Sequence, residues 1–142
     1  MKPLAEPLAR LLDRVLPPEM QFDAVVPVPL HWRRRWHRGF NQAELLARHI
    51  AKRRQIPVLN ALRRKRPTAT QAGLAVAGRR RNVAGAFEPR RKKGIHGARI
   101  LLIDDVMTTG ATANACATVL KRSGAKSVSL LTLARVDRRW RD

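Results

Sequence analysis

The chain has 142 residues and a formal net charge of +20, because 30 lysines and arginines stand against only 10 aspartates and glutamates. Its length fits one domain spanning residues 1–142, and a hydrophobic share of 44% excludes a chain too polar to fold. The single cysteine excludes an intramolecular disulfide framework and a cysteine-based zinc site, and no apolar run approaches the ~20 residues of a membrane span, so we expect a cytoplasmic protein without a transmembrane segment.

The first half of the chain predicts two helices and a buried strand. Segment 4–16, within an N-terminal helical region at 1–20, has helical spacing of apolar residues and ends at a proline pair. Residues 22–26 are apolar and β-branched, which indicates a buried strand, and a basic loop follows at 31–39. A second helix begins near Asn41, an acceptable N-cap, and residues 56–59 predict a short edge strand. The apolar positions of the two helices are Leu4, Leu8, Leu11, Leu12 and Val15, and then Ala43, Leu45, Leu46, Ile50 and Ala51.

The second half predicts a strand–helix–strand unit at 98–136, preceded by a long basic loop. Residues 63–96 are weakly periodic, with helix expected only around 73–81, and such a segment is usually functional or mobile. Residues 98–104 and 126–133 are apolar strands, separated by a helix at 113–123 that ends at Gly124. This order implies a right-handed crossover, so the predicted fold class is α/β, a mostly parallel sheet flanked by helices.

The stretch 100–112 carries the clearest chemistry. Asp104 and Asp105 end an apolar strand at the carboxyl edge of the predicted sheet, where α/β folds bind ligands. The loop that opens the next helix offers hydroxyls and backbone N–H groups, which suit a phosphate. The acids suit sugar hydroxyls or a hydrated Mg²⁺, so a ribose 5-phosphate fits the whole stretch. The alternative is that the acids only cap the turn, although two adjacent carboxylates repel each other unless a ligand offsets the repulsion.

This stretch resembles the signature that binds 5-phosphoribosyl 1-diphosphate (PRPP) in type I phosphoribosyltransferases: four apolar residues, two acids, two mostly apolar residues and Thr-x-Gly-x-Thr. The resemblance widens to the competence protein F (ComF/GntX-like) family and covers roughly residues 20–136. The segments that carry it are Val26-Pro-Val-Pro-Leu30, Arg38-Gly-Phe-Asn-Gln-Ala-Glu-Leu45, Thr70-Gln-Ala-Gly-Leu74 and Arg79-Arg-Arg-Asn-Val-Ala-Gly-Ala-Phe87.

The resemblance implies an activity and a set of site residues. The expected reaction is Mg²⁺-dependent transfer of the phosphoribosyl group from PRPP to an acceptor, a nucleobase among the candidates, with release of pyrophosphate. Asp104 and Asp105 would be the catalytic acids at the ribose hydroxyls and would touch the metal only indirectly. The other implied residues are Thr108, Thr109, Gly110, Ala111 and Thr112 for the 5-phosphate, Pro29, Leu30, His31 and Arg38 for the pyrophosphate, and Thr70, Gln71 and Arg79 in a mobile loop.

Two departures from the family pattern bear on function. Family members often begin with a four-cysteine zinc ribbon, but this chain has only Cys116, so we expect no zinc and either a short gene or a truncated start. Purine-salvage enzymes of the superfamily carry an acid where Thr108 stands, which lowers the case for a 6-oxopurine acceptor. Cys116 is expected to be a buried, unreactive helix residue.

The positive charge keeps a second interpretation open: a non-catalytic protein that senses PRPP or binds DNA during DNA uptake and natural competence. Trp32 and Trp36 stand among arginines, so they either stack on bases or pack their loop onto the helix at 41–54. The cations at 90–93 and 135–141 have no role in the PRPP site and support DNA contact or a solvated surface. Many relatives pair, so a homodimer is also expected.

Overall fold

The computed structural model describes residues 2–29, 41–65, 85–91, 93–107 and 110–135. The basic loop expected at 31–39 and the helix expected around 73–81 lie outside these ranges. The described helices and strands, in chain order, are α1 (Lys2–Val15), β1 (Ala24–Pro27), α3 (Gln42–Arg54), β2 (Leu62–Arg64), β3 (Phe87–Pro89), β4 (Arg99–Met107), α5 (Ala111–Arg122) and β5 (Ser127–Arg135).

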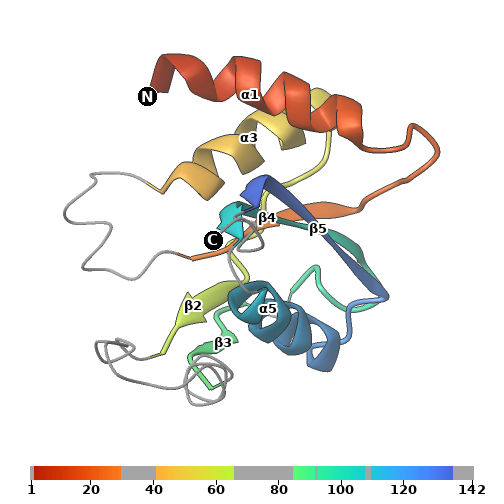
Figure 1. Ribbon diagram of the computed structural model, residues 1–142. Coiled ribbons are helices and arrows are strands. Elements are labelled where there is room, and N and C mark those ends of the chain that lie inside the picture. Colours follow the sequence, from red (N-terminus) through yellow and green to blue (C-terminus); the bar gives the residue numbers. More distant parts are fainter. Residues whose placement is uncertain (1, 30–40, 66–84, 92, 108–109, 136–142) are drawn as a thin grey trace, which may run out of the picture.

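A parallel sheet of order β1-β4-β5 forms the centre of the molecule (Figure 1). Strand β4 lies in the middle, with Val25 of β1 in register with Leu101 and Leu130 of β5 in register with Leu102. An isolated parallel bridge between Val25 and Val58 adds the short edge segment expected at 56–59. The predicted strand–helix–strand unit and its parallel sheet are therefore confirmed.

Helices cover both faces of this sheet because neighbouring residues of β4 point to opposite sides. Leu101 and Ile103 belong to a core shared with α1 and α3, whereas Ile100 and Leu102 belong to a core shared with α5 and the β2–β3 hairpin. The side chains of these four residues of β4 are fully buried. No helix within the described ranges is both long and apolar enough to cross a bilayer.

The region expected to be a loop at 63–96 contains structure at both of its ends. Strands β2 and β3 pair antiparallel, with Arg63 opposite Glu88 and Arg64 opposite Phe87. The prediction of little structure was therefore wrong at these ends, although residues 66–84 lie outside the described part. The hairpin forms because Leu62 and Phe87 bury their side chains in the α5 core, which compensates for two arginines in a three-residue strand.

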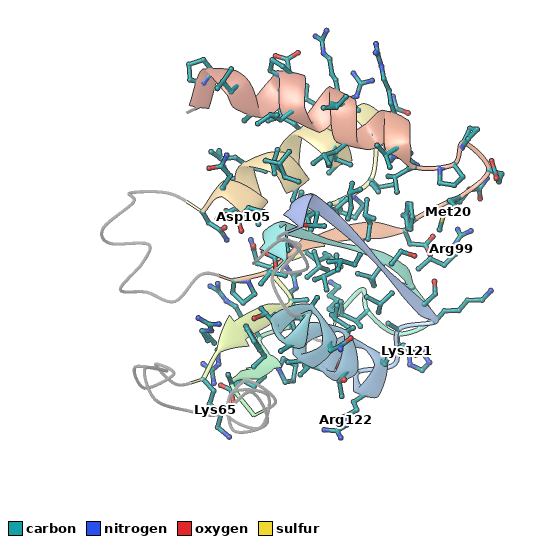
Figure 2. The ribbon with its side chains drawn as sticks, viewed as in Figure 1. Met20, Lys65, Arg99, Asp105, Lys121 and Arg122 are labelled. Atoms are coloured by element: carbon teal, nitrogen blue, oxygen red, sulfur yellow. The ribbon has the colours of Figure 1, made fainter. Side chains whose placement is uncertain are left out.

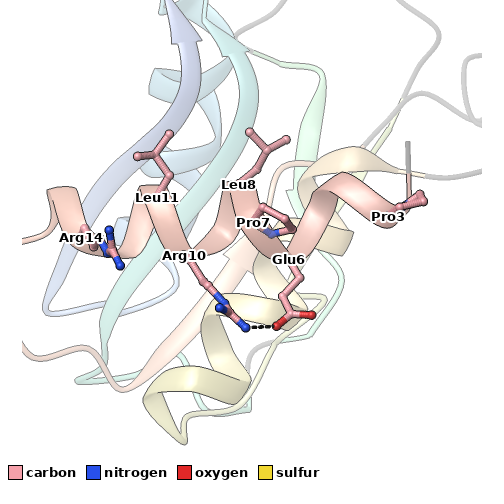
Figure 3. Close-up of a pocket in the computed structure, with 7 residues that line it drawn as sticks. All are labelled: Pro3, Glu6, Pro7, Leu8, Arg10, Leu11 and Arg14. Carbon is pink, nitrogen blue, oxygen red and sulfur yellow. Dashed lines mark hydrogen bonds and ion pairs between the residues drawn. The ribbon is translucent and has the colours of Figure 1, made fainter.

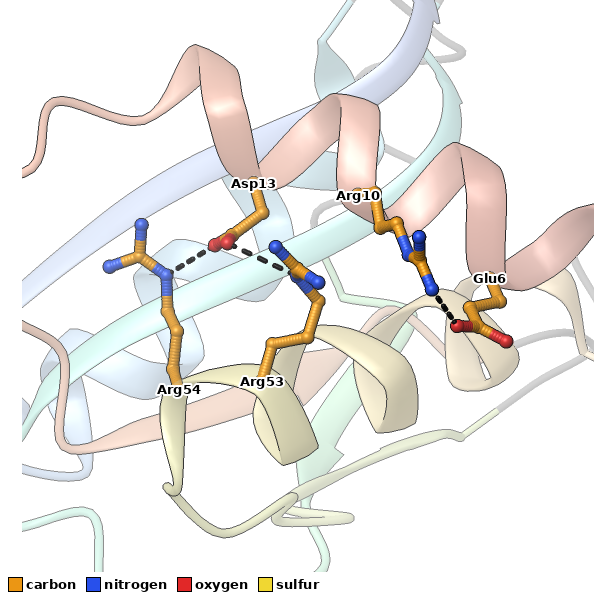
Figure 4. A network of polar contacts seen from close by, with 5 residues as sticks. All are labelled: Glu6, Arg10, Asp13, Arg53 and Arg54. Carbon is orange, nitrogen blue, oxygen red and sulfur yellow. Dashed lines mark hydrogen bonds and ion pairs between the residues drawn. The ribbon is translucent and has the colours of Figure 1, made fainter.

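Helix α1 forms where expected, but it buries a different face. Ala5, Ala9 and Leu12 are buried against α3, whereas Leu4, Leu11 and Val15 remain exposed. Two ion pairs join the helices: the Asp13 carboxylate accepts from Arg54 Nε at 2.6 Å and from Arg53 Nε at 3.4 Å (Figure 4). Small alanines let the backbones of the two helices approach closely, and the two ion pairs lie beside this contact.

Candidate phosphoribosyl-binding site

The acid pair lies within β4 and not after it, because the strand continues to Met107 beyond the predicted end at Asp104. Asp104 is only 9% exposed and pairs in register with Thr132 of β5. Its Oδ1 accepts the backbone N–H of Asp105 at 2.9 Å, and the Asp105 carbonyl accepts from Thr132 Oγ1 at 3.4 Å. Figure 2 shows Asp105 and Arg99 at opposite ends of β4, so the acids occupy the carboxyl edge of the sheet.

The electrostatics of the pair favour a protonated or cation-balanced state. Burial raises the pKa of Asp104 from 3.8 to about 7, and the charge of Asp105 adds to the rise. The Arg64 guanidinium opposes this change in the pKa. A ligand that donates hydrogen bonds, or a nearby cation, would therefore stabilise the ionised form of Asp104.

The start of α5 supplies the second part of the site. Gly110 is the N-cap residue, with φ 80° and ψ −1°, a left-handed conformation that glycine adopts without strain. Its carbonyl accepts the Asn114 N–H at 2.9 Å, and Ala111 and Thr112 are half-buried in the first turn. Thr108 and Thr109 lie outside the described residues. The positive end of the helix dipole thus faces the edge of the sheet that carries the acids, an arrangement suited to a phosphate.

The segment after β1 reaches the same edge. The Val28 N–H donates to the Ile103 carbonyl at 2.9 Å, and the Val28 carbonyl accepts from Asn41 Nδ2 at 3.2 Å. Asn41 Oδ1 accepts the Ala43 N–H at 3.1 Å, which confirms the predicted N-cap. A recess of about 70 Å³ opens here, lined by Pro27, Pro29, Asn41, Glu44, Asn60, Leu62 and Arg90. Of the predicted pyrophosphate residues, Pro29 lines this recess, and Leu30, His31 and Arg38 lie outside the described residues.

The hairpin brings one residue to the site that the sequence interpretation missed. Arg64, the last residue of β2, lies over the Phe87 ring with its guanidinium carbon 5.1 Å from the ring centroid. Its charge acts on both Asp104 and Cys116. The sequence signal was weak, because Arg64 is one of several arginines and only its pairing with Phe87 distinguishes it. Thr70, Gln71 and Arg79, expected in the mobile loop, lie outside the described residues.

Other candidate residues take no part in a described metal or nucleophile site. Cys116 is fully buried, which confirms the expected buried helix residue, and burial raises the pKa of its thiol to about 12. The described residues contain no group of three or more His, Cys, Asp or Glu side chains placed to hold a metal ion. His96 is exposed, as expected, and Arg90, Arg91 and Lys93 are exposed beside it in sequence.

The fold and the match to a family model define the class of protein. The chain belongs to the phosphoribosyl transferase domain family, whose model matches residues 37–142. It is 39% identical to competence protein F of Haemophilus influenzae over 115 residues, which cover 80% of this chain and 50% of that protein. It is 40% identical to the DNA utilization protein YhgH of Escherichia coli K12 over 114 residues, covering 80% and 49%, respectively. The chain thus spans about half the length of these relatives.

Solved structures support the same fold. The allosteric regulatory enzyme of purine biosynthesis superposes with a TM-score of 0.65 at 20% identity, covering 93% of this chain and 26% of that one. An adenine phosphoribosyltransferase superposes with a TM-score of 0.60 at 17% identity, covering 94% and 68%. The chain therefore has the type I phosphoribosyltransferase fold expected from its sequence.

Proposed function

We propose that this chain binds PRPP at the carboxyl edge of its sheet and transfers the phosphoribosyl group to an acceptor, a nucleobase among the candidates. The observation that carries the proposal is the adjacent pair of a buried Asp104 and a half-buried Asp105 at the edge of the sheet where α5 starts at Gly110. Membership of the phosphoribosyl transferase domain family supports it. A cytoplasmic location fits this proposal, because the one cysteine is buried and requires no oxidising compartment.

Different residues would bind different parts of PRPP. The carboxylates of Asp104 and Asp105 would accept hydrogen bonds from the ribose hydroxyls, and the loop from Thr108 to Thr112 would hold the 5-phosphate. The segment after β1, at 27–31, would face the diphosphate, with Arg38 as a source of positive charge. In the transfer, the acceptor forms a bond to C1′ while the bond from C1′ to the diphosphate oxygen breaks, and pyrophosphate leaves with the electron pair.

Mg²⁺ fits this site only in company with the substrate. Two adjacent carboxylates are a small ligand set, and Mg²⁺ commonly combines one or two carboxylates with waters and substrate phosphates. Asp104 and Asp105 would hold it through water or through the ribose hydroxyls, and the ion would neutralise charge on the departing diphosphate. The residues of the chain would position the sugar, and the fold shields the Asp104 carboxyl from most solvent.

The direct test is thermal unfolding with and without PRPP and Mg²⁺. We expect the ligand to raise the Tm of the parent chain, because binding to the folded state alone stabilises it, by about 2.7 kcal/mol at a hundredfold excess over Kd. Asp105→Asn should remove most of this shift, whereas Glu19→Gln, at an exposed position away from the site, should keep it. Equal shifts in all three proteins would refute the site. Pyrophosphate release with a panel of bases then tests for turnover.

A second function is favoured by the names of the relatives and by the net charge of +20. In this alternative the domain binds PRPP without turnover and contacts DNA during DNA uptake. We expect the affinity for a single-stranded oligonucleotide to fall as salt rises, with a log–log slope of about −0.7 for each phosphate contacted. Binding that is absent, or independent of salt, would contradict this function.

A further inference from the structure

Helix α1 carries a row of apolar side chains that the described part of the molecule leaves open to solvent. Leu4, Leu8, Leu11 and Val15 recur at spacings of four, three and four residues, which aligns them along one side of the helix. Leu4, Leu11 and Val15 are 54%, 58% and 69% exposed, and Leu8 is half-buried. We call these four residues the α1 stripe. Single exposed leucines are common on protein surfaces, but a continuous row of apolar residues indicates a surface for another molecule.

The spacing of the α1 stripe is that of a coiled-coil seam. Steps of four, three and four place Leu4 and Leu11 at heptad position d and Leu8 and Val15 at position a. The next apolar residue on that side, Leu12 at position e, is already buried in the core. The exposed apolar residues are therefore confined to the a and d positions, and such a narrow stripe has the width that packs against one further helix.

Helix α1 presents the stripe on a firm support. Ala9 and Leu12 are buried in the core that α1 shares with α3, and the Asp13 carboxylate accepts from Arg54 Nε of α3 at 2.6 Å. A partner would meet a helix that is already formed and held in place. This arrangement removes part of the entropic cost of binding.

Positive charge borders the α1 stripe on its open side. Arg14 occupies heptad position g beside Leu11, is exposed and makes no ion pair within the described ranges. Arg10 lies one turn earlier, where its Nη2 donates to Glu6 Oε1 at 2.6 Å. Figure 3 shows these side chains around a hollow of about 590 Å³ beside Leu8 and Leu11. Because a charged residue at position g pairs with the facing helix, an acidic flank on that helix would complement Arg14.

We propose that α1 docks an amphipathic helix of a partner protein whose apolar seam is flanked by aspartate or glutamate residues. A second copy of this chain would instead bring a second Arg14 and a further net charge of +20 to the interface, where like charges repel. The core beneath α1 lies on the opposite face of the sheet from the core beneath α5. The proposal is therefore independent of PRPP binding.

The test measures the fluorescence anisotropy of a labelled synthetic peptide titrated with the full chain. The peptide is about three heptads long, with leucine at a and d and glutamate at e and g, and its glutamates oppose self-association. We expect saturable binding whose Kd rises at least about tenfold in Leu11→Asp. Leu130→Asp is the matched control and should keep the parent Kd, because Leu130 is also exposed but pairs in register with Leu102, on the α5 side of the sheet. Circular dichroism confirms that each variant folds.

A charge exchange tests the acidic flank separately from the apolar seam. Arg14→Glu should weaken binding of the glutamate peptide and strengthen binding of a peptide with lysine at the same e and g positions. Arg122→Glu, which replaces an exposed cation in the last turn of α5, is the matched control and should leave the preference for glutamate unchanged. Added salt should weaken binding of the glutamate peptide, because salt screens the attraction between opposite charges.

Several results would overturn the proposal. A parent chain that binds neither peptide, binds both equally well, or retains its Kd in Leu11→Asp has no docking site for an acidic helix on α1. A parent dimer in sedimentation that Leu11→Asp dissociates would assign the α1 stripe to a second copy instead. Binding to phosphatidylglycerol vesicles that Leu11→Asp abolishes, and with which the glutamate peptide does not compete, would assign the stripe to a lipid surface.

Discussion

Asp104→Asn will raise the thermal stability of the ligand-free chain above about pH 7 and abolish its response to PRPP and Mg²⁺. Burial and the neighbouring charge of Asp105 raise the pKa of Asp104 from 3.8 to about 7 in the folded chain. Above this pH the folded protein must hold an ionised carboxylate with little solvation beside a second acid. Asparagine has the same shape, carries no charge and still accepts the Asp105 N–H through its oxygen.

The sign of the pH dependence follows from proton uptake. Between about pH 4 and pH 7 the folded chain holds a proton on Asp104 that the unfolded chain has lost, so this group lowers the stability as the pH rises through that window. At 1.36 kcal/mol per pKa unit, and discounted for the coupling to Asp105, we expect a gain on the order of 2 kcal/mol for Asp104→Asn at about pH 8. The gain should vanish near pH 4, where the parent residue is neutral.

Unfolding in denaturant at several pH values measures this effect, and the matched control is Asp23→Asn. The Asp23 carboxylate accepts from Arg99 Nη2 at 3.0 Å, and its pKa is lowered to about 2 by hydrogen bonds from Arg99. The same substitution there removes a favourable contact, so it should not stabilise the chain at any pH. If Asp104→Asn is less stable than the parent at pH 8, the ionised Asp104 does not destabilise the folded chain. If the variant still binds PRPP, the proposed contact between Asp104 and the ribose is wrong.

The strand–helix–strand unit could be predicted because its signals are local. Apolar runs, the Asn41 cap and Gly124 each determine the structure of only the few residues next to them. Gly124 adopts φ 100° after α5, as expected for a residue that ends a helix. The acid pair could be placed at the carboxyl edge for the same reason. Its position inside β4 was missed, because the strand's extension depends on pairing with β5 as far as Arg135.

The predictions were wrong where contacts between distant parts of the chain determine the local structure. Helix α1 has two apolar faces that overlap at Leu8 and Leu12, and the sequence does not reveal that the alanine face meets α3. The β2–β3 hairpin has three-residue strands rich in charge, and it exists because Leu62 and Phe87 reach the α5 core. The Arg64 charge acts on the pKa of Asp104 because the hairpin places Arg64 near the site, so no spacing rule along the chain could have found this residue.

Substitutions at two neighbouring leucines of β4 should distinguish an effect on the stability of the fold from an effect on ligand binding. Leu101 and Leu102 are both fully buried, but Leu101 faces the α1 and α3 core and Leu102 faces the core shared with α5 and the hairpin. Replacing either leucine with alanine deletes buried methyl groups and leaves a cavity, at a cost of about 3 kcal/mol. For a chain of this size, this cost lowers the Tm by about 10 °C.

Their effects on ligand binding should differ. Leu102 packs with the elements that bring Gly110 and Arg64 to the acid pair, so Leu102→Ala should loosen the site and weaken PRPP binding at a temperature where the variant remains folded. Leu101→Ala removes the same side chain from the opposite face and should leave the affinity near that of the parent. Titration calorimetry well below both Tm values measures this difference. Equal losses of affinity in the two variants would show that the site depends on the whole sheet rather than on the α5 face.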